Sequence, residues 1–143
     1  MQIFTTLLLA LAPSLGMALP DGEELVLSRP TVLVLFTPDS EMDESERNTQ
    51  DFQDFIDDFL VYQSSLADAL KDNLQVQFKT STAGRVQLEG AETITRAELG
   101  GFGVIVFVPG QEPVVFDGVA TDADVLCGLH RQLPGAVEVS GCD

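Results

Sequence analysis

The side chains in this chain that could do chemistry are mostly carboxylates, and one short segment carries Asp39, Glu41, Asp43, Glu44 and Glu46. Carboxylates at alternate positions are the ligands of calcium loops, but the glycine for the sharp turn and the closing glutamate are missing here. The segment therefore favours a solvated helix start over a metal site, and weak cation buffering by the acidic helix is a further alternative. It predicts either the solvated start of a helix or a surface that binds a basic partner protein. The second interpretation extends to Asp54 and Asp58 in the following helix.

Two cysteines, Cys127 and Cys142, are the only thiol groups of the chain. Their spacing is far too wide for the Cys-x-x-Cys pair of thiol–disulfide enzymes. In an exported protein an even number of cysteines predicts a disulfide, which here would tie the last helix to the C-terminal tail. The alternative is residual thiol or peroxide chemistry by a reduced, exposed Cys127.

Other catalytic signals are weak. His130 is the single histidine, and it lies near the end of a predicted helix, where the helix dipole favours an imidazolium and a surface or capping role. The serines lack the G-x-S-x-G context of an activated nucleophile. The sequence has no phosphate-binding glycine loop and no Cys/His cluster. It therefore predicts no catalytic residue, no metal and no cofactor.

The charge balance is strongly acidic, with 23 acidic and 7 basic residues and a formal net charge of −16. Such a surface repels nucleic acid and anionic lipid and attracts cationic partners at low ionic strength. We therefore expect no nucleic-acid binding and consider a basic protein as the partner. A solvated face without a partner, or adaptation to salt, would also explain this composition.

The N-terminus is typical of a signal peptide. Residues 3–15 are almost wholly apolar, and Gly16-Met17-Ala18 provides small residues at a cleavage site. We expect residues 1–18 to be removed and residues 19–143 to form one domain. No second apolar run is long enough for a membrane span, so the mature protein is expected to be periplasmic or extracellular. An uncleaved N-terminal anchor is the alternative.

Two apolar runs, Thr31 to Thr37 and Val104 to Val108, predict central strands. Neither alternates with polar residues, so both faces of their sheet should be covered, with helices on each side. Shorter or half-exposed strands are expected at Leu25 to Leu27, Leu74 to Thr80, Arg85 to Leu88 and Val114 to Phe116.

The region from Asp39 to Asn73 is expected to be mostly helical. It carries one apolar stripe at helical spacing, formed by Phe52, Phe55, Ile56, Phe59, Leu66 and Leu70. We interpret this stripe as core, and Ser64-Ser65 as a kink or break. Asp39, Ser40 and Ser45 are candidate N-caps. A short helix is expected at Thr93 to Leu99, and a last helix at Asp122 to Leu133 with a capping box formed by Thr121 and Asp124.

The order strand, helix, strand, connecting helix, hairpin, helix resembles the thioredoxin-like fold. The resemblance covers roughly residues 29–134 and is strongest from Phe102 to Leu133. It implies a three-layer α/β sandwich with a mixed sheet of about four strands flanked by helices. Where that family has its Cys-x-x-Cys pair, this chain has Asp39-Ser-Glu-Met. Where the family has a cis-proline before the hairpin, it has Gly100-Gly101-Phe102-Gly103.

Among thioredoxin-like proteins, the chain is similar to short exported bacterial proteins of unknown function that lack the cysteine pair. The working nucleophile of the redox chemistry is a thiolate, and the predicted helix start offers none. We therefore expect a non-redox binding module that uses its acidic surface, such as a periplasmic inhibitor or immunity protein. The alternative is an oxidoreductase that uses Cys127.

Overall fold

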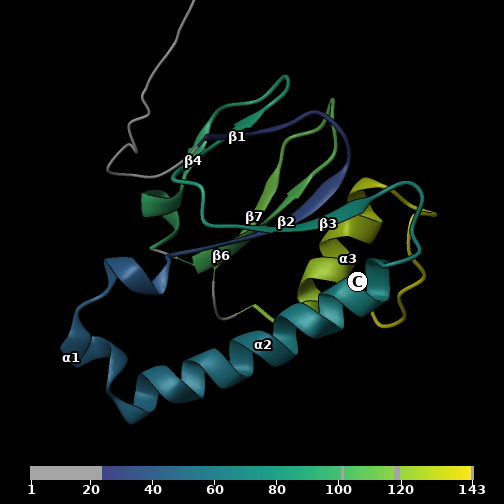
Figure 1. Ribbon diagram of the computed structural model, residues 1–143. Coiled ribbons are helices and arrows are strands. Elements are labelled where there is room, and N and C mark those ends of the chain that lie inside the picture. Colours follow the sequence, from purple (N-terminus) through teal and green to yellow (C-terminus); the bar gives the residue numbers. More distant parts are fainter. Residues whose placement is uncertain (1–23, 101, 118–119, 143) are drawn as a thin grey trace, which may run out of the picture.

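The computed structural model describes residues 24–100, 102–117 and 120–142, with the side chains of Asp39 and Asp117 excepted. The predicted signal peptide, its cleavage site and Gly101 lie outside the described residues. Figure 1 shows a mixed α/β arrangement with a central sheet, two helices against one of its faces and a small second sheet against the other. No helix in the described ranges is both long enough and apolar enough to cross a bilayer.

The central sheet has four strands in the order β3-β2-β6-β7. The strands are β2 (Thr31–Phe36), β3 (Gln77–Ser81), β6 (Phe102–Phe107) and β7 (Val114–Asp117). Strand β2 pairs in parallel with β3 and antiparallel with β6, which in turn pairs antiparallel with β7. The two apolar runs are thus the central strands, as predicted, because only a central strand buries both of its faces.

Helices α2 (Gln50–Leu70) and α3 (Asp122–Gln132) cover one face of this sheet. Val32 and Val104 point to this side, where they pack with Leu66 and Leu129 in one buried cluster. The predicted capping box at the start of α3 is present: Thr121 accepts from the Asp124 amide at 3.1 Å, and Asp124 accepts from the Thr121 amide at 3.0 Å. The limits of α3 agree with the prediction to within one residue.

The other face corrects the prediction of helices on both sides. It is covered by a second, three-stranded sheet in the order β1-β4-β5, with β1 (Glu24–Leu27), β4 (Arg85–Leu88) and β5 (Ile94–Thr95). Leu27, Val86 and Leu88 point inward and bury Leu33 and Phe107 of the central sheet. Buried and exposed residues alternate along β4. The small sheet therefore covers the central sheet with one apolar face and keeps a polar face toward solvent.

The segment after β4 also differs from the prediction. Instead of one short helix at 93–99, the chain forms β5 and then the 3₁₀ helix η2 (Arg96–Leu99). Pairing of Ile94 and Thr95 with β4 uses the backbone that a longer helix would need. Thr95 and Glu98 form a capping box, and Gly100 ends the helix in the left-handed region at φ 70°.

The acidic segment after β2 is broken rather than continuous helix. It contains the 3₁₀ helix η1 (Asp39–Glu41), the single-turn helix α1 (Glu44–Arg47) and then α2. Asp43 caps α1, and Thr49 caps α2 by accepting from the Phe52 amide at 3.1 Å. The predicted N-caps Asp39, Ser40 and Ser45 are not the capping residues of these helices.

Helix α2 runs continuously through Ser64-Ser65, so the predicted break into two helices is absent there. The hydroxyl of Ser65 donates to the carboxylate of Asp122 in α3, so it does not compete with the helix backbone. Beyond α2, strand β3 begins later than predicted. The side chain of Asn73 accepts from the amides of Gln75 and Val76, at 2.9 Å each, and holds a turn there.

The C-terminal tail lies against α3 and the end of α2. Cys127 and Cys142 are joined by a disulfide, with their Cα atoms 5.5 Å apart. Asn73 donates to the Ala136 carbonyl at 2.6 Å, and a His130 ring nitrogen lies 3.3 Å from the Val137 carbonyl oxygen. The tail therefore belongs to the folded structure, and His130 serves as a contact for it.

Candidate functional site

An open groove of about 700 Å³ lies where β2 ends. One wall is the N-terminal part of α2, including Phe52, Phe55 and Leu60. The other wall is the segment that follows β2 and contains η1 and α1. Phe102, at the start of β6, and Gly100 complete the lining. The size is typical of a site that holds a small ligand or a few side chains of a partner.

The groove exists because α2 is longer than the sheet that it covers. A helix of 21 residues is about 31 Å long, whereas a six-residue strand such as β2 spans about 20 Å. Figure 1 shows α2 extending past the sheet toward α1. The residues that α2 buries are Phe59, Leu66 and Leu70. The earlier part of the apolar stripe therefore extends past the sheet and meets it only at its edge, where Phe55 contacts Phe102 at the start of β6.

Aromatic rings form the apolar part of the groove. Phe59 lies at the centre of the cluster, with its ring centroid 5.2 Å from that of Phe36 and 5.1 Å from that of Phe102. Phe55 lies 5.6 Å from Phe102. Such contacts hold the rings in defined positions. Phe55 nevertheless keeps 42% of its surface exposed, which corrects the prediction that the whole stripe is core. Leu60, which lies outside the predicted stripe, is 54% exposed.

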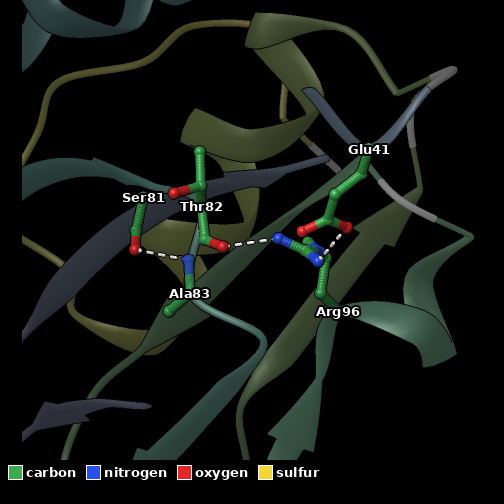
Figure 2. Close-up of polar contacts among 5 residues, drawn as sticks. All are labelled: Glu41, Ser81, Thr82, Ala83 and Arg96. Atoms are coloured by element: carbon green, nitrogen blue, oxygen red, sulfur yellow. Dashed lines mark hydrogen bonds and ion pairs between the residues drawn. The ribbon is translucent and has the colours of Figure 1, made fainter. Parts of the chain in front are cut away.

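Glu41, which lines the groove, forms an ion pair with Arg96, which lies outside the lining. The Arg96 side chain is 8% exposed, and its Nη2 atom lies 2.6 Å from Oε1 of Glu41. Figure 2 shows the same guanidinium also donating to the Thr82 carbonyl. A buried guanidinium needs such partners because leaving it unpaired is costly. A second cavity of about 430 Å³ lies around Arg96 and shares Thr37, Glu41 and Gly100 with the groove.

The structure brings together only part of the predicted acidic site. Glu41 and Glu46 line the groove, and Asp43 forms the capping box of α1, where Glu46 accepts from its amide at 3.2 Å. Glu44 is exposed nearby. Asp54 and Asp58 are exposed and do not line the groove. The side chain of Asp39 lies outside the described residues.

Sequence reasoning missed Arg96 and the surface role of the phenylalanines. Arg96 looked like an ordinary residue of a short polar helix, and its partner Glu41 is 55 positions away. The phenylalanines fit a core stripe equally well. One sequence signal could have indicated the exposed phenylalanines: the apolar stripe of the helix is longer than the predicted strands that would cover it.

Tyr62 is a neighbour of the groove residue Phe102 and has a raised pKa. Its ring packs against Phe102, with centroids 6.2 Å apart, and its buried hydroxyl has no hydrogen-bond partner among the described residues. Burial, followed by the negative charges of Asp122 and Asp124, raises the pKa of Tyr62 from 10.0 to about 12. The phenol therefore stays neutral at physiological pH. Away from the groove, hydrogen bonds from the amide and the hydroxyl of Thr95 lower the pKa of Glu98.

Both cysteines of the chain are in the disulfide, and none of the residues that line the groove is a cysteine. In the part of the chain that the structure describes, no three His, Cys, Asp or Glu side chains converge as metal ligands. The groove combines an apolar wall on α2 with the carboxylates of Glu41 and Glu46 on the opposite wall.

In comparisons with known proteins, no family model, no curated protein and no solved structure matches this chain.

Proposed function

We propose that this chain is an exported, non-redox protein of thioredoxin-like fold that binds a basic partner protein through the acidic wall of the groove. The fold proposal is supported by the element order β2, α2, β3, η2, β6–β7 and α3, which is the order of the resemblance. The small sheet on the second face is a departure from a helix-flanked sandwich.

The observation that carries the binding proposal is the place of the groove. It lies at the end of β2, where the resemblance puts the redox pair, and its walls contain Glu41 and Glu46 but no cysteine. Arg47 is the only basic residue among positions 36–63, against nine acidic ones. A cationic partner is favoured there by complementary charge, which speeds association and excludes anionic partners.

A basic toxin or enzyme is the kind of partner that this surface fits, and the protein would act as its periplasmic inhibitor or immunity protein. The net charge of −16 supports this role because it draws a cationic protein from a distance. The alternative of thiol chemistry requires a reduced Cys127, and in the structure that sulfur is bonded to Cys142.

The test is capture from periplasmic extract at low salt with three forms of the protein. These are the wild type, the double variant Glu44→Gln/Glu46→Gln, which changes the groove residue Glu46 and its neighbour Glu44, and the double variant Asp68→Asn/Asp72→Asn at and just beyond the C-terminal end of α2. Both variants remove two exposed negative charges. We expect the wild type and the far-end variant to capture the same partner and to release it in about 0.5 M salt, because screening weakens such a complex.

The groove variant should capture much less of that partner. Gln at position 46 keeps the capping box of α1, so a loss of capture would reflect charge rather than helix fraying. Equal loss in both variants would contradict a localised site. If the captured partner stays bound in about 0.5 M salt, binding does not depend mainly on charge, which contradicts the proposal.

A further inference from the structure

The two walls of the groove differ in chemistry. The α2 wall is apolar, with Phe52, Phe55 and Leu60 facing the space, whereas the opposite wall carries Glu41 and Glu46. A ligand that fills the groove must therefore be apolar on one side and able to neutralise carboxylates on the other. Neither a purely polar cationic chain nor an uncharged apolar one would match both walls.

The two carboxylates are held in place before any ligand arrives. One oxygen of Glu41 is fixed by Arg96 at 2.6 Å, yet 38% of the Glu41 side chain remains exposed. Glu46 is oriented by its hydrogen bond from the Asp43 amide. An ionised carboxylate has about four acceptor sites, so each can still accept from a ligand cation. Fixed acceptors lower the ordering cost of binding.

The apolar wall is unusual for a surface. Phe55 and Leu60 are 42% and 54% exposed within a hollow that also contains Phe59 and Phe102. Contiguous exposed apolar surface of this kind marks interaction sites. A second copy of the chain is a poor occupant, because each copy brings a net charge of −16 to the contact.

We infer, on the basis of the proposed function, that the groove receives an amphipathic cationic helix of the partner protein. Its large apolar side chains pack between Phe55, Leu60 and Phe102. Lys or Arg at the edge of its apolar face donates to Glu41 and Glu46 in charge-assisted hydrogen bonds. This is the helix-in-groove mode of recognition, in which side chains at i, i+3, i+4 and i+7 anchor one face.

The experiment uses two synthetic peptides of about 18 residues with the same Leu and Lys composition. In the first, Leu recurs at helical spacing and forms one apolar face; in the second, the order is scrambled. Affinities are measured by fluorescence anisotropy at low salt for the wild type and for single variants. Leu60→Ser and Phe55→Ser remove groove contacts. Val61→Ser is the matched control, because Val61 is 71% exposed and lies outside the groove.

We expect the amphipathic peptide to bind the wild type at least tenfold more tightly than the scrambled one. Leu60→Ser and Phe55→Ser should each weaken it about tenfold, the size of an interface hot spot, and Val61→Ser less than about twofold. Phe55 packs against Phe59 and Phe102, so weaker binding by Phe55→Ser counts only if the variant keeps the wild-type melting curve by circular dichroism. Leu60→Ser tests the same groove at a more exposed side chain.

Two results would overturn the inference. If both peptides bind equally and Val61→Ser behaves like Leu60→Ser, recognition depends on net charge alone; the proposed function then stands and the groove has no part in it. If neither peptide binds at low salt, the amphipathic occupant is wrong, and the capture experiment decides separately whether a basic partner exists.

Discussion

The two ends of α2 use the same kind of side chain for opposite purposes. From Phe59 onward the apolar stripe is buried, and Leu66 and Leu70 lie in the core against β2 and β6. Before Phe59 the stripe continues, but Phe55 remains exposed in the groove. Periodicity is identical in both parts. The difference comes from what lies opposite the helix: the sheet at one end, and the acidic segment after β2 at the other.

The comparison shows why an amphipathic pattern does not by itself identify a core. A stripe marks a face that needs a partner, and the partner can be the same chain or another molecule. The following predictions test whether the C-terminal part of α2 supports the fold while the N-terminal part is reserved for binding.

The largest expected effect is on stability at Leu66, which is completely buried. Leu66→Ala should lower the free energy of unfolding by about 2–5 kcal/mol, because it leaves a cavity in the core. Leu60→Ala on the exposed part of the helix should change it by less than about 0.5 kcal/mol. Urea unfolding of both variants measures the contrast. Equal destabilisation would show that the groove wall is core after all.

The disulfide is expected to have the next largest effect. Cys127 and Cys142 are 15 positions apart, and closing such a loop stabilises a protein by roughly 3 kcal/mol in the chain-entropy model. The variant Cys127→Ala/Cys142→Ala should melt at a lower temperature yet remain folded. Titration of the native wild type should find no free thiol. A reactive thiol would instead favour the alternative of redox chemistry by Cys127.

Removing Glu41 should have a moderate effect on stability in addition to any effect on binding. Glu41→Ala leaves the buried Arg96 guanidinium without its carboxylate partner and should cost about 2 kcal/mol, the penalty of a buried group left unsatisfied. The matched variant Glu46→Gln leaves that ion pair intact and should cost little. If the two variants unfold at the same urea concentration, the Glu41–Arg96 pair does not stabilise the fold.

The smallest effect at neutral pH is expected at Tyr62, where it appears only in alkali. The pKa of its phenol is raised in the folded state from 10.0 to about 12, so the folded state disfavours ionisation. Stability from this group is complete below pH 10 and is lost as the pH rises toward 12. Tyr62→Phe should unfold like the wild type at pH 7 and resist alkali better. Identical alkaline unfolding curves would contradict this prediction.

The central strands, the hairpin partner β7 and helix α3 could be predicted from sequence because each has a strong local signal. The apolar runs of β2 and β6 require burial on both faces. The capping box of Thr121 and Asp124 marks the start of α3. Periodicity and caps act within a few residues, so these elements need no knowledge of the rest of the chain.

Other features depend on distant partners and could not be predicted from local patterns. The second sheet forms because β1 pairs with β4, which lies far along the chain. The break before α2 depends on the cap Thr49, which was not among the predicted caps Asp39, Ser40 and Ser45. The site was predicted only in part: Glu41 and Glu46 were named, but Arg96 and the exposed phenylalanines emerge only when the end of β2 meets η2 and α2.

The most direct test of the groove as a binding surface is an amide chemical-shift map of the labelled protein titrated with the amphipathic cationic peptide. We expect the perturbed amides to lie in residues 36–46 and 52–63 and around Gly100 and Phe102, which together surround the groove. The C-terminal end of α2 should remain unperturbed. Shifts spread evenly over all exposed acidic residues, or concentrated near Asp68 and Asp72, would contradict a binding site in the groove.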